Sequence, residues 1–337
     1  MLKTLRASTE AVKIALIQPP ALQVQDSYSS ITQPPLGIAY LSAYAKRLGH
    51  EVVVLDAVGP ALSRAEAWPA KAGFMVQGLS LDEVAARVPK DAQVVGFSCM
   101  FTHGWPMVRE LMAKVKAAAP GAFFIAGGEH ATAMPEQVLR DGGMDLVVLG
   151  EGEATFGEVL EKLSRGAVET GGRASRPPLG KALAGRGDRD WSGQAGVAFL
   201  DRQRAFTAGP RQPRVMDLDS LPLPDWDSLD IMAYLDGHIF MGPSGPSSRS
   251  IPMLATRGCP YACTFCASAN MWTRHYRTRT PAKVVDEMAR WKERFGANDF
   301  QFQDLTAIVR KEWIVAFCRE LISRKLGVTW QVPVGTR

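Results

Sequence analysis

Short apolar runs alternate with amphipathic segments over the first half of this 337-residue chain. The apolar runs are residues 12–17, 52–55, 94–97, 123–126 and 146–149. Runs of four to six residues fit strands that are buried on both faces, as in a parallel sheet covered by helices. Helical signals lie between them: Pro35 and Pro106 can each open a helix, and Ser80 with Glu83 has capping-box spacing. The pattern predicts a doubly wound, flavodoxin-like α/β sheet.

The loops that follow these runs are where such a sheet binds its ligand, beyond the carboxyl ends of the strands. Two of these loops are rich in glycine, at residues 127–130 and 150–153. Glycines let backbone amides come close to a large flat or phosphorylated ligand. A plain turn would show the same Gly-Gly pattern, so the loops alone leave both readings open.

Composition divides the chain into three parts. Residues 166–213 are dominated by Gly, Arg, Ala, Ser and Pro and show almost no hydrophobic period. We therefore expect a first domain at 12–165, a linker at 166–250 and a second domain at 251–337. Within the linker, residues 197–200 and 205–207 can pair as a β-hairpin.

The charge balance and the cysteines limit the class of protein to which this chain can belong. Lys plus Arg number 39 and Asp plus Glu 34, so the net charge is +5. This excess is spread out rather than gathered in a basic stripe, and no nucleic-acid partner is expected. No run approaches the ~20 apolar residues of a membrane span, and no signal-peptide pattern is present. Five cysteines, three of them within eight residues, suit metal binding and predict a cytoplasmic protein with reduced thiols.

The most informative motif is the triplet Cys259, Cys263 and Cys266, spaced C-x3-C-x2-C directly after an apolar run. Zinc takes four ligands, usually as two separated pairs, and no second pair follows. Three thiolates on a compact loop suit a 4Fe–4S cluster and leave its fourth iron free for an external ligand. A three-thiol zinc site and a chance arrangement are the alternatives.

The triplet, with Phe265 before its last cysteine, resembles the radical S-adenosylmethionine (SAM) superfamily. Three later segments are similar to that family's first barrel helix, second strand and third strand: residues 277–287, 300–304 and 330–337. Three earlier segments resemble the cobalamin-binding domain of its cobalamin-dependent members: residues 33–41, 127–132 and 150–153. That group includes C- and P-methyltransferases and the anaerobic Mg-protoporphyrin ester cyclase.

The resemblance implies roles for residues near the triplet. The three cysteines would ligate a 4Fe–4S cluster, with SAM chelated at the open iron. Phe265 would pack near the adenine of SAM, Asp304 would help hold its methionyl amine, and Arg337 would lie close to the same pocket. Read without the resemblance, Asp304 is equally a turn residue after a strand, and Phe265 equally a core-packing residue.

Cobalamin contacts are implied in four loops of the first domain. The implied residues are Pro35, Gly37, Ser98, His103, Gly127, Gly128, His130, Gly150, Glu151 and Gly152. The D-x-H-x-x-G motif that supplies a lower-axial histidine elsewhere is absent, so we expect no histidine on cobalt from the first strand's loop. His103 and His130 are candidate neighbours of the corrin. Cys99 and Cys318 are expected to be buried small hydrophobes.

The implied function is an enzyme that uses three cofactors. A 4Fe–4S cluster would cleave SAM to a 5′-deoxyadenosyl radical, and the radical would start methylation or cyclisation of an unactivated carbon of a small-molecule substrate. An external donor such as flavodoxin or ferredoxin would supply the electron, and cobalamin would carry the methyl group. The alternatives are a non-catalytic cobalamin-binding fragment and a methylthiotransferase-like radical SAM enzyme without cobalamin.

The second domain departs from the family in length. At ~30 residues per βα unit, residues 251–337 hold about three units. The expected strands and helices are residues 251–255, 281–295, 300–302, 311–325 and 328–334. Members of the family close a partial (β/α)6 barrel, so we expect only its N-terminal half here, which puts activity of this chain alone in question. The chain is then a fragment, a protein completed by a second polypeptide, or a remnant.

Overall fold

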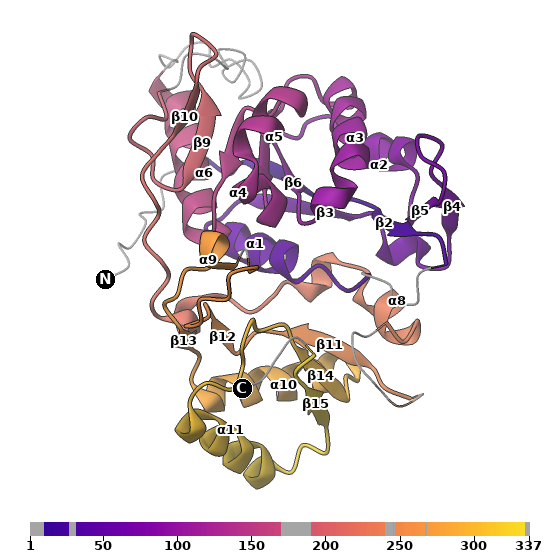
Figure 1. The fold of residues 1–337 in the computed structure, drawn as a ribbon, viewed down its shortest axis with the longest axis vertical. Helices are drawn as coiled ribbons and strands as arrows, with labels where there is room; N and C mark the ends of the chain where they lie inside the picture. The colour runs from indigo at the N-terminus through magenta and orange to yellow at the C-terminus, as the bar shows by residue number, and fades with distance from the viewer. Residues whose placement is uncertain are drawn as a thin grey trace.

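A seven-stranded sheet forms the core of the first domain in the computed structural model, which describes residues 10–26, 32–169, 190–239, 245, 247–266 and 268–333. Its strands are β1 (Lys13–Gln18), β3 (Glu51–Asp56), β6 (Val94–Ser98), β7 (Phe123–Gly127), β8 (Leu146–Val148), β9 (Val197–Leu200) and β10 (Phe206–Ala208). The spatial order is β10-β9-β8-β7-β6-β1-β3, and the strands from β8 to β3 run parallel (Figure 1). Counted along the chain, the parallel strands lie in the order 2-1-3-4-5, which confirms the flavodoxin-like prediction.

Helices cover both faces of this sheet, and β1 shows why its strands are continuously apolar. Ile14 and Leu16 pack with one set of helices, while Ala15 and Ile17 pack with the other. The first set is α1 (Leu36–Arg47) and α6 (Gly152–Glu169), and the second is α2 (Leu81–Arg87), α3 (Trp105–Ala118) and α5 (Pro135–Asp141). Successive side chains of a strand point to opposite faces, so both must be apolar when both faces are covered.

The capping box expected before α2 is present. Ser80 accepts a hydrogen bond from the backbone N–H of Glu83, and the Ser80 N–H donates to the Glu83 carboxylate. The two bonds satisfy amides that the first turn of a helix leaves without intrahelical partners.

The predicted hairpin forms, but it does not stand apart in a linker. Strands β9 and β10 pair antiparallel, and β9 pairs antiparallel with β8, so the hairpin extends the edge of the main sheet. Other short elements were not predicted: β2 (Ala21–Val24), β4 (Ala65–Ala67), β5 (Phe74–Gln77), α4 (Glu129–Ala133), α8 (Ile231–Asp236) and the 3₁₀ turns η1 (Gly59–Ala61), η2 (Thr102–Gly104), η3 (Leu218–Ser220) and η4 (Trp226–Ser228). They are only three to six residues long, too short to show a hydrophobic period.

The second half builds a separate three-stranded parallel sheet below the first domain (Figure 1). Its elements are β11 (Ser250–Met253), α10 (Pro281–Phe295), β14 (Asp299–Phe302), α11 (Lys311–Arg324) and β15 (Thr329–Gln331). Both helices match their expected ranges to within one residue, whereas β15 is shorter than the strand expected at 328–334. The core of this half includes Ala39 of α1 and Trp226, so the two halves share apolar packing. That this sheet is the N-terminal half of a partial (β/α)6 barrel stays a prediction.

Within the described part of the chain, no helix combines the length and apolarity needed to cross a bilayer. All five cysteines are free thiols.

Candidate functional site

A cavity of about 60 Å³ opens where β1 and β6 end, at the point where the strand order of the main sheet reverses. Gln18 and Ser98 are the last residues of these two strands, and both line it. The rest of its wall includes Leu22 of β2 and Trp105 at the start of α3. A reversal point of a doubly wound sheet is the usual ligand site, because neighbouring helices lie on opposite faces there and leave a crevice.

Three side chains in this cavity carry buried polar atoms without a hydrogen-bond partner among the described residues. They are the Trp105 Nε1–H, the His130 Nε2 and the Gln33 Oε1. Trp105 and His130 are almost fully buried, and their ring centroids lie 4.9 Å apart. Burial lowers the pKa of His130, which favours the neutral ring. Leaving buried donors and acceptors unpaired is costly, so the cavity is suited to a ligand that brings polar groups of its own.

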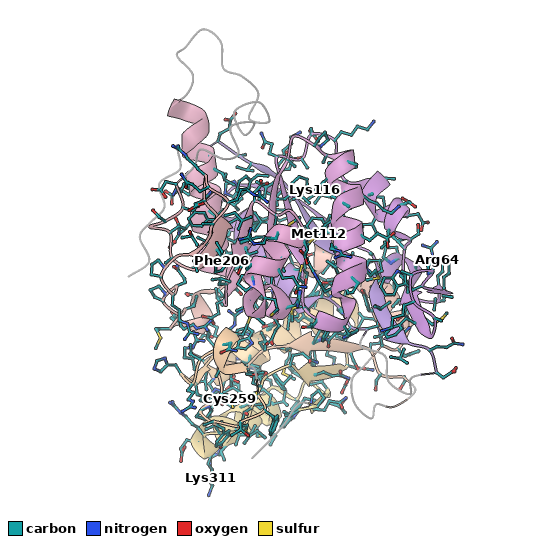
Figure 2. All side chains as sticks on the ribbon, turned by 45° about the horizontal axis from the view of Figure 1, so that its top comes forward. Arg64, Met112, Lys116, Phe206, Cys259 and Lys311 are labelled. Carbon is teal, nitrogen blue, oxygen red and sulfur yellow. The ribbon has the colours of Figure 1, made fainter. Side chains whose placement is uncertain are left out.

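The cysteine triplet lies on a loop that leaves and re-enters a short two-stranded ladder, β12 (Thr256–Arg257) with β13 (Arg277–Thr278). Gly258 begins the loop with φ +84°, and a Cβ there would lie 2.2 Å from the carbonyl oxygen of His275. Only glycine fits such a close crossing of the two ends of the loop. Figure 2 labels Cys259 in the orange and yellow half, below the first domain.

The thiols of the loop differ in exposure. Cys259 is partly buried, with its Sγ 3.4 Å from the Thr306 Oγ1, while Cys263 and Cys266 are exposed. Among the residues that the structure describes, no three Cys, His, Asp or Glu side chains are gathered in a metal-holding group. The three thiols therefore lie on one loop, but their sulfur atoms are not gathered around a common point. As a donor set they fit an iron–sulfur cluster, since all are free and two face solvent.

Known proteins are similar to this chain over both of its halves. The B12 binding domain family matches residues 30–160. Cytidylyl-2-hydroxyethylphosphonate methyltransferase from Streptomyces wedmorensis is 28% identical over 96% of this chain and 60% of its own length. The anaerobic magnesium-protoporphyrin IX monomethyl ester cyclase of Rubrivivax gelatinosus is 29% identical over 89% of this chain and 46% of its own.

Two solved structures share the fold across both halves of the chain. The radical SAM methyltransferase TsrM from Kitasatospora setae, with cobalamin and a [4Fe-4S] cluster bound, gives a TM-score of 0.59 at 18% identity over 93% of this chain and 53% of that one. The cobalamin-dependent radical enzyme OxsB, with aqua-cobalamin and SAM bound, gives 0.65 at 15% identity over 95% of this chain and 38% of that one. The chain is thus similar in sequence to these methyltransferase and cyclase relatives, and it shares the fold of cobalamin-dependent radical SAM enzymes. It spans 60% or less of the length of these relatives.

The residues expected to contact cobalamin fall into two groups in this structure. Ser98, His103 and His130 line the cavity. The His103 Nε2 lies 3.1 Å from the carbonyl oxygen of Leu22. The remaining predicted residues lie outside the cavity wall: Pro35, Gly37, Gly127, Gly128, Gly150, Glu151 and Gly152. Their cobalamin contacts stay predictions.

Gln33 lies in the segment 33–41 that resembles a cobalamin-binding domain, but sequence reasoning missed other parts of the cavity wall, including Trp105 and Leu22. One signal could have found part of it. The segment from Gln18 to Pro20 follows the first strand, and strands one and three of a flavodoxin-like order are neighbours at the reversal point. The residues that follow these two strands therefore lie close together, whether or not they are glycines.

Phe265 is 91% exposed, so the reading that it packs in the core is wrong. Its predicted place near the adenine of SAM remains open to test, because the ring projects from the cysteine loop into solvent. Arg337, the third predicted SAM neighbour, lies outside the described residues.

Asp304 lies two residues after the end of β14 and is fully buried. Its two carboxylate oxygens accept from the backbone N–H of Ala255 at 3.2 and 3.1 Å. Ala255 immediately precedes β12, so in this structure the carboxylate ties β14 to the strand that leads into the cysteine loop. Its predicted contact with the methionyl amine stays a prediction.

Replacing Asp304 with asparagine is expected to change how stability depends on pH. Burial raises the pKa of Asp304 from 3.8 to about 6, against the opposing effect of the Ala255 hydrogen bond. The folded state therefore binds the proton more tightly than the unfolded state, and the wild type loses stability as the pH rises from about 4 to about 6. At 1.36 kcal/mol per pKa unit the loss is about 3 kcal/mol.

Urea unfolding of the cofactor-free chain at pH 4.5 and pH 7 measures this effect. The stability of Asp304→Asn relative to the wild type should rise between the two values, whereas the exposed-site variant Asp227→Asn should follow the wild type. An identical pH dependence in wild type and Asp304→Asn would contradict the assignment.

Proposed function

We propose that this chain carries the cobalamin-binding and cluster-binding parts of a radical SAM enzyme that methylates or cyclises an unactivated carbon. The observation that carries the proposal is the attachment of the cysteine loop to the first domain. The ladder β12–β13 at the base of the loop is ion-paired to the residues after β8, at the same carboxyl edge of the sheet at which the cavity opens beyond β1 and β6. Both candidate cofactor sites therefore lie along one edge of the main sheet.

The cavity supports cobalamin as the ligand of the first domain. Its unpartnered Trp105 donor and neutral His130 ring suit a ligand with polar groups at its end, and its apolar wall suits a flat one. A volume of about 60 Å³ holds only part of so large a molecule, so the cavity would take an extension of cobalamin while the macrocycle lies outside.

The cysteine loop supports the cluster. When bound, a 4Fe–4S cluster supplies the electron that splits SAM into methionine and a 5′-deoxyadenosyl radical, and cobalamin supplies the methyl carrier. The chain's own contribution is placement. Asp304 and Gly258 fix the entry to the loop, and Thr306 contacts its first thiol. Holding reactants in fixed relative positions and away from water is the protein's share of such chemistry.

The proposed radical SAM function also implies binding partners for this chain. We propose a small-molecule substrate bound between the two halves and an external one-electron donor such as flavodoxin or ferredoxin. Strand β15 pairs with β14 on one side and, within the described residues, with no strand on the other. Further chain, or a second polypeptide, adding a strand there would extend the sheet toward a barrel.

Anaerobic reconstitution with iron and sulfide, followed by hydroxocobalamin titration and reduction in the presence of SAM, tests the proposal. The expected results are a cluster absorbance, a shifted cobalamin spectrum and release of 5′-deoxyadenosine. Cobalamin binding without deoxyadenosine would favour a non-catalytic module. Deoxyadenosine without any cobalamin spectral change would favour the methylthiotransferase-like alternative.

A further inference from the structure

Two glutamates at the start of α6 hold both ends of the cysteine loop. We propose that Glu151 and Glu153 are positioning residues that close the base of this loop and fix it against the first domain. The inference deepens the proposed function, on which it rests, because the loop would then present its cluster to the cavity at the strand ends.

Glu153 pairs with Arg257, two residues before the first cysteine of the loop. The Arg257 Nη2 donates to the Glu153 Oε1 at 2.5 Å, and its Nη1 donates to the Oε2 at 3.1 Å. Both side chains are nearly buried, at 4% and 6% exposure. The guanidinium also lies over the rings of Tyr40 and Trp272, 5.4 and 5.5 Å from their centroids. A two-pronged pair between planar groups fixes orientation as well as distance.

Glu151 reaches both sides of the loop. Its Oε1 accepts from the Arg277 Nη2 at 2.9 Å and from the Arg257 Nη1 at 3.4 Å. Its Oε2 accepts from the Arg277 Nη1 at 3.2 Å and from the backbone N–H of Val215 at 3.2 Å, and Arg214 lies 3.7 Å away. One carboxylate from the first domain thus bridges the strand before the loop and the strand after it.

The ladder itself shows why this bridge is needed. Arg257 and Arg277 lie directly opposite each other in the antiparallel pair β12–β13. Like charges at opposed positions repel, and here both guanidiniums are buried, at 4% and 5% exposure. Without an acid between them, this two-residue ladder would be forced apart. The carboxylate of Glu151 therefore lets the base of the loop close.

The segment after the thiols is held in the same place. Arg214 donates to the carbonyl oxygen of Met271, at the end of α9 (Ser268–Met271), and the hydroxyl of Thr132 in α4 lies 3.5 Å from the Met271 sulfur. The same hydroxyl accepts from the N–H of Gly150. The segments 127–132 and 150–153, which resemble a cobalamin-binding domain, thus also contact the cysteine loop and the residues that follow it.

Buried ion pairs add little net stability over apolar packing, because the cost of desolvating the charges offsets their attraction. Removing one partner, however, leaves the other charge buried and unpaired, which is strongly destabilising. The best-supported use of such pairs is to specify one arrangement. The network lies at the base of a nineteen-residue loop between the paired residues 257 and 277. At this place it can hold the loop in one arrangement relative to the first domain.

Hydrogen exchange in the cofactor-free chain tests the inference. In Glu151→Gln, amides between residues 256 and 278 should exchange at least about tenfold faster than in the wild type, while β6 and β7 stay unchanged. The matched control is Glu136→Gln, which removes the carboxylate of an exposed pair with Arg140 and should leave residues 256–278 as in the wild type. Glu151→Asp, which keeps the charge, should restore part of the protection.

Reconstituted protein gives the second readout. The spin-resonance spectrum of the reduced cluster should respond to SAM in the wild type and in Glu136→Gln, and the response should be weakened or lost in Glu151→Gln. If Glu151→Gln does not fold, as judged by circular dichroism, Glu151→Asp takes its place and is compared in the same two measurements.

Wild-type exchange at residues 256–278 in a folded variant would overturn the inference, as would an equal acceleration in all strands. The exchange measurement needs no cofactor. A wild type that takes up no cluster would therefore contradict the proposed function and still leave the role of Glu151 decided.

Discussion

Cys263→Ala is expected to abolish cluster uptake. After anaerobic reconstitution the wild type should hold ~4 irons per chain, and the variant fewer than about one, with loss of the visible absorbance. The physical reason is the donor set. In the proposed cluster, the three thiolates of one loop would be the protein ligands, and the open fourth iron could not replace a missing thiolate. The measurement is iron and sulfide content beside the absorption spectrum.

Cys318→Ala is the matched control, since Cys318 is a free thiol on α11, away from the loop. It should keep its iron and absorbance. Full iron content in Cys263→Ala, or uptake of zinc in preference to iron by the wild type, would contradict the cluster assignment.

Gly104→Phe is expected to weaken cobalamin binding by about tenfold or more, or at least about 1.4 kcal/mol, without unfolding the first domain. Gly104 is buried, lines the cavity and has helical dihedral angles, φ −80° and ψ −10°. No neighbouring atom lies within 4 Å of the place its Cβ would take. A benzyl group can therefore enter the open space without backbone strain and occupy a cavity of only about 60 Å³.

Gly121→Phe provides the comparison, because Gly121 also has open space around its Cβ position but is exposed and precedes β7 at the opposite edge of the sheet. Titration with hydroxocobalamin, followed by its absorbance, and thermal unfolding of both variants make the measurement. Equal affinity in Gly104→Phe and the wild type would place the ligand elsewhere. A loss shared by both variants would show that the effect is not specific to the cavity.

Local patterns predicted the elements whose signals are contained within a few residues. The continuous apolar runs reported strands covered on both faces, and α10 occupies its expected range because Pro281 begins it and Gly296 ends it at φ +68°. The hairpin β9–β10 was also visible in the chain. Its attachment to β8 was not, since strand pairing between elements is set by packing and leaves no local mark.

The candidate site divides in the same way. The cysteines, the glycine at the loop entry and the family resemblance could be read from residue types and spacing. Phe265 shows the limit: an aromatic residue between cysteines looks the same in a sequence whether it packs inside or, as here, lies 91% exposed.

The amino-acid sequence by itself determined the doubly wound sheet and the spacing of the three thiols, and it carried the family resemblance, because periodicity, capping and ligand spacing are local properties. Only the tertiary structure decided which strand-end loops border the cavity, since that depends on where the strand order reverses. It also decided that Glu151 and Glu153 lie against Arg257 and Arg277, over 100 residues away along the chain. A buried charge must find its partner in space, and nothing in the neighbouring residues records which partner that is.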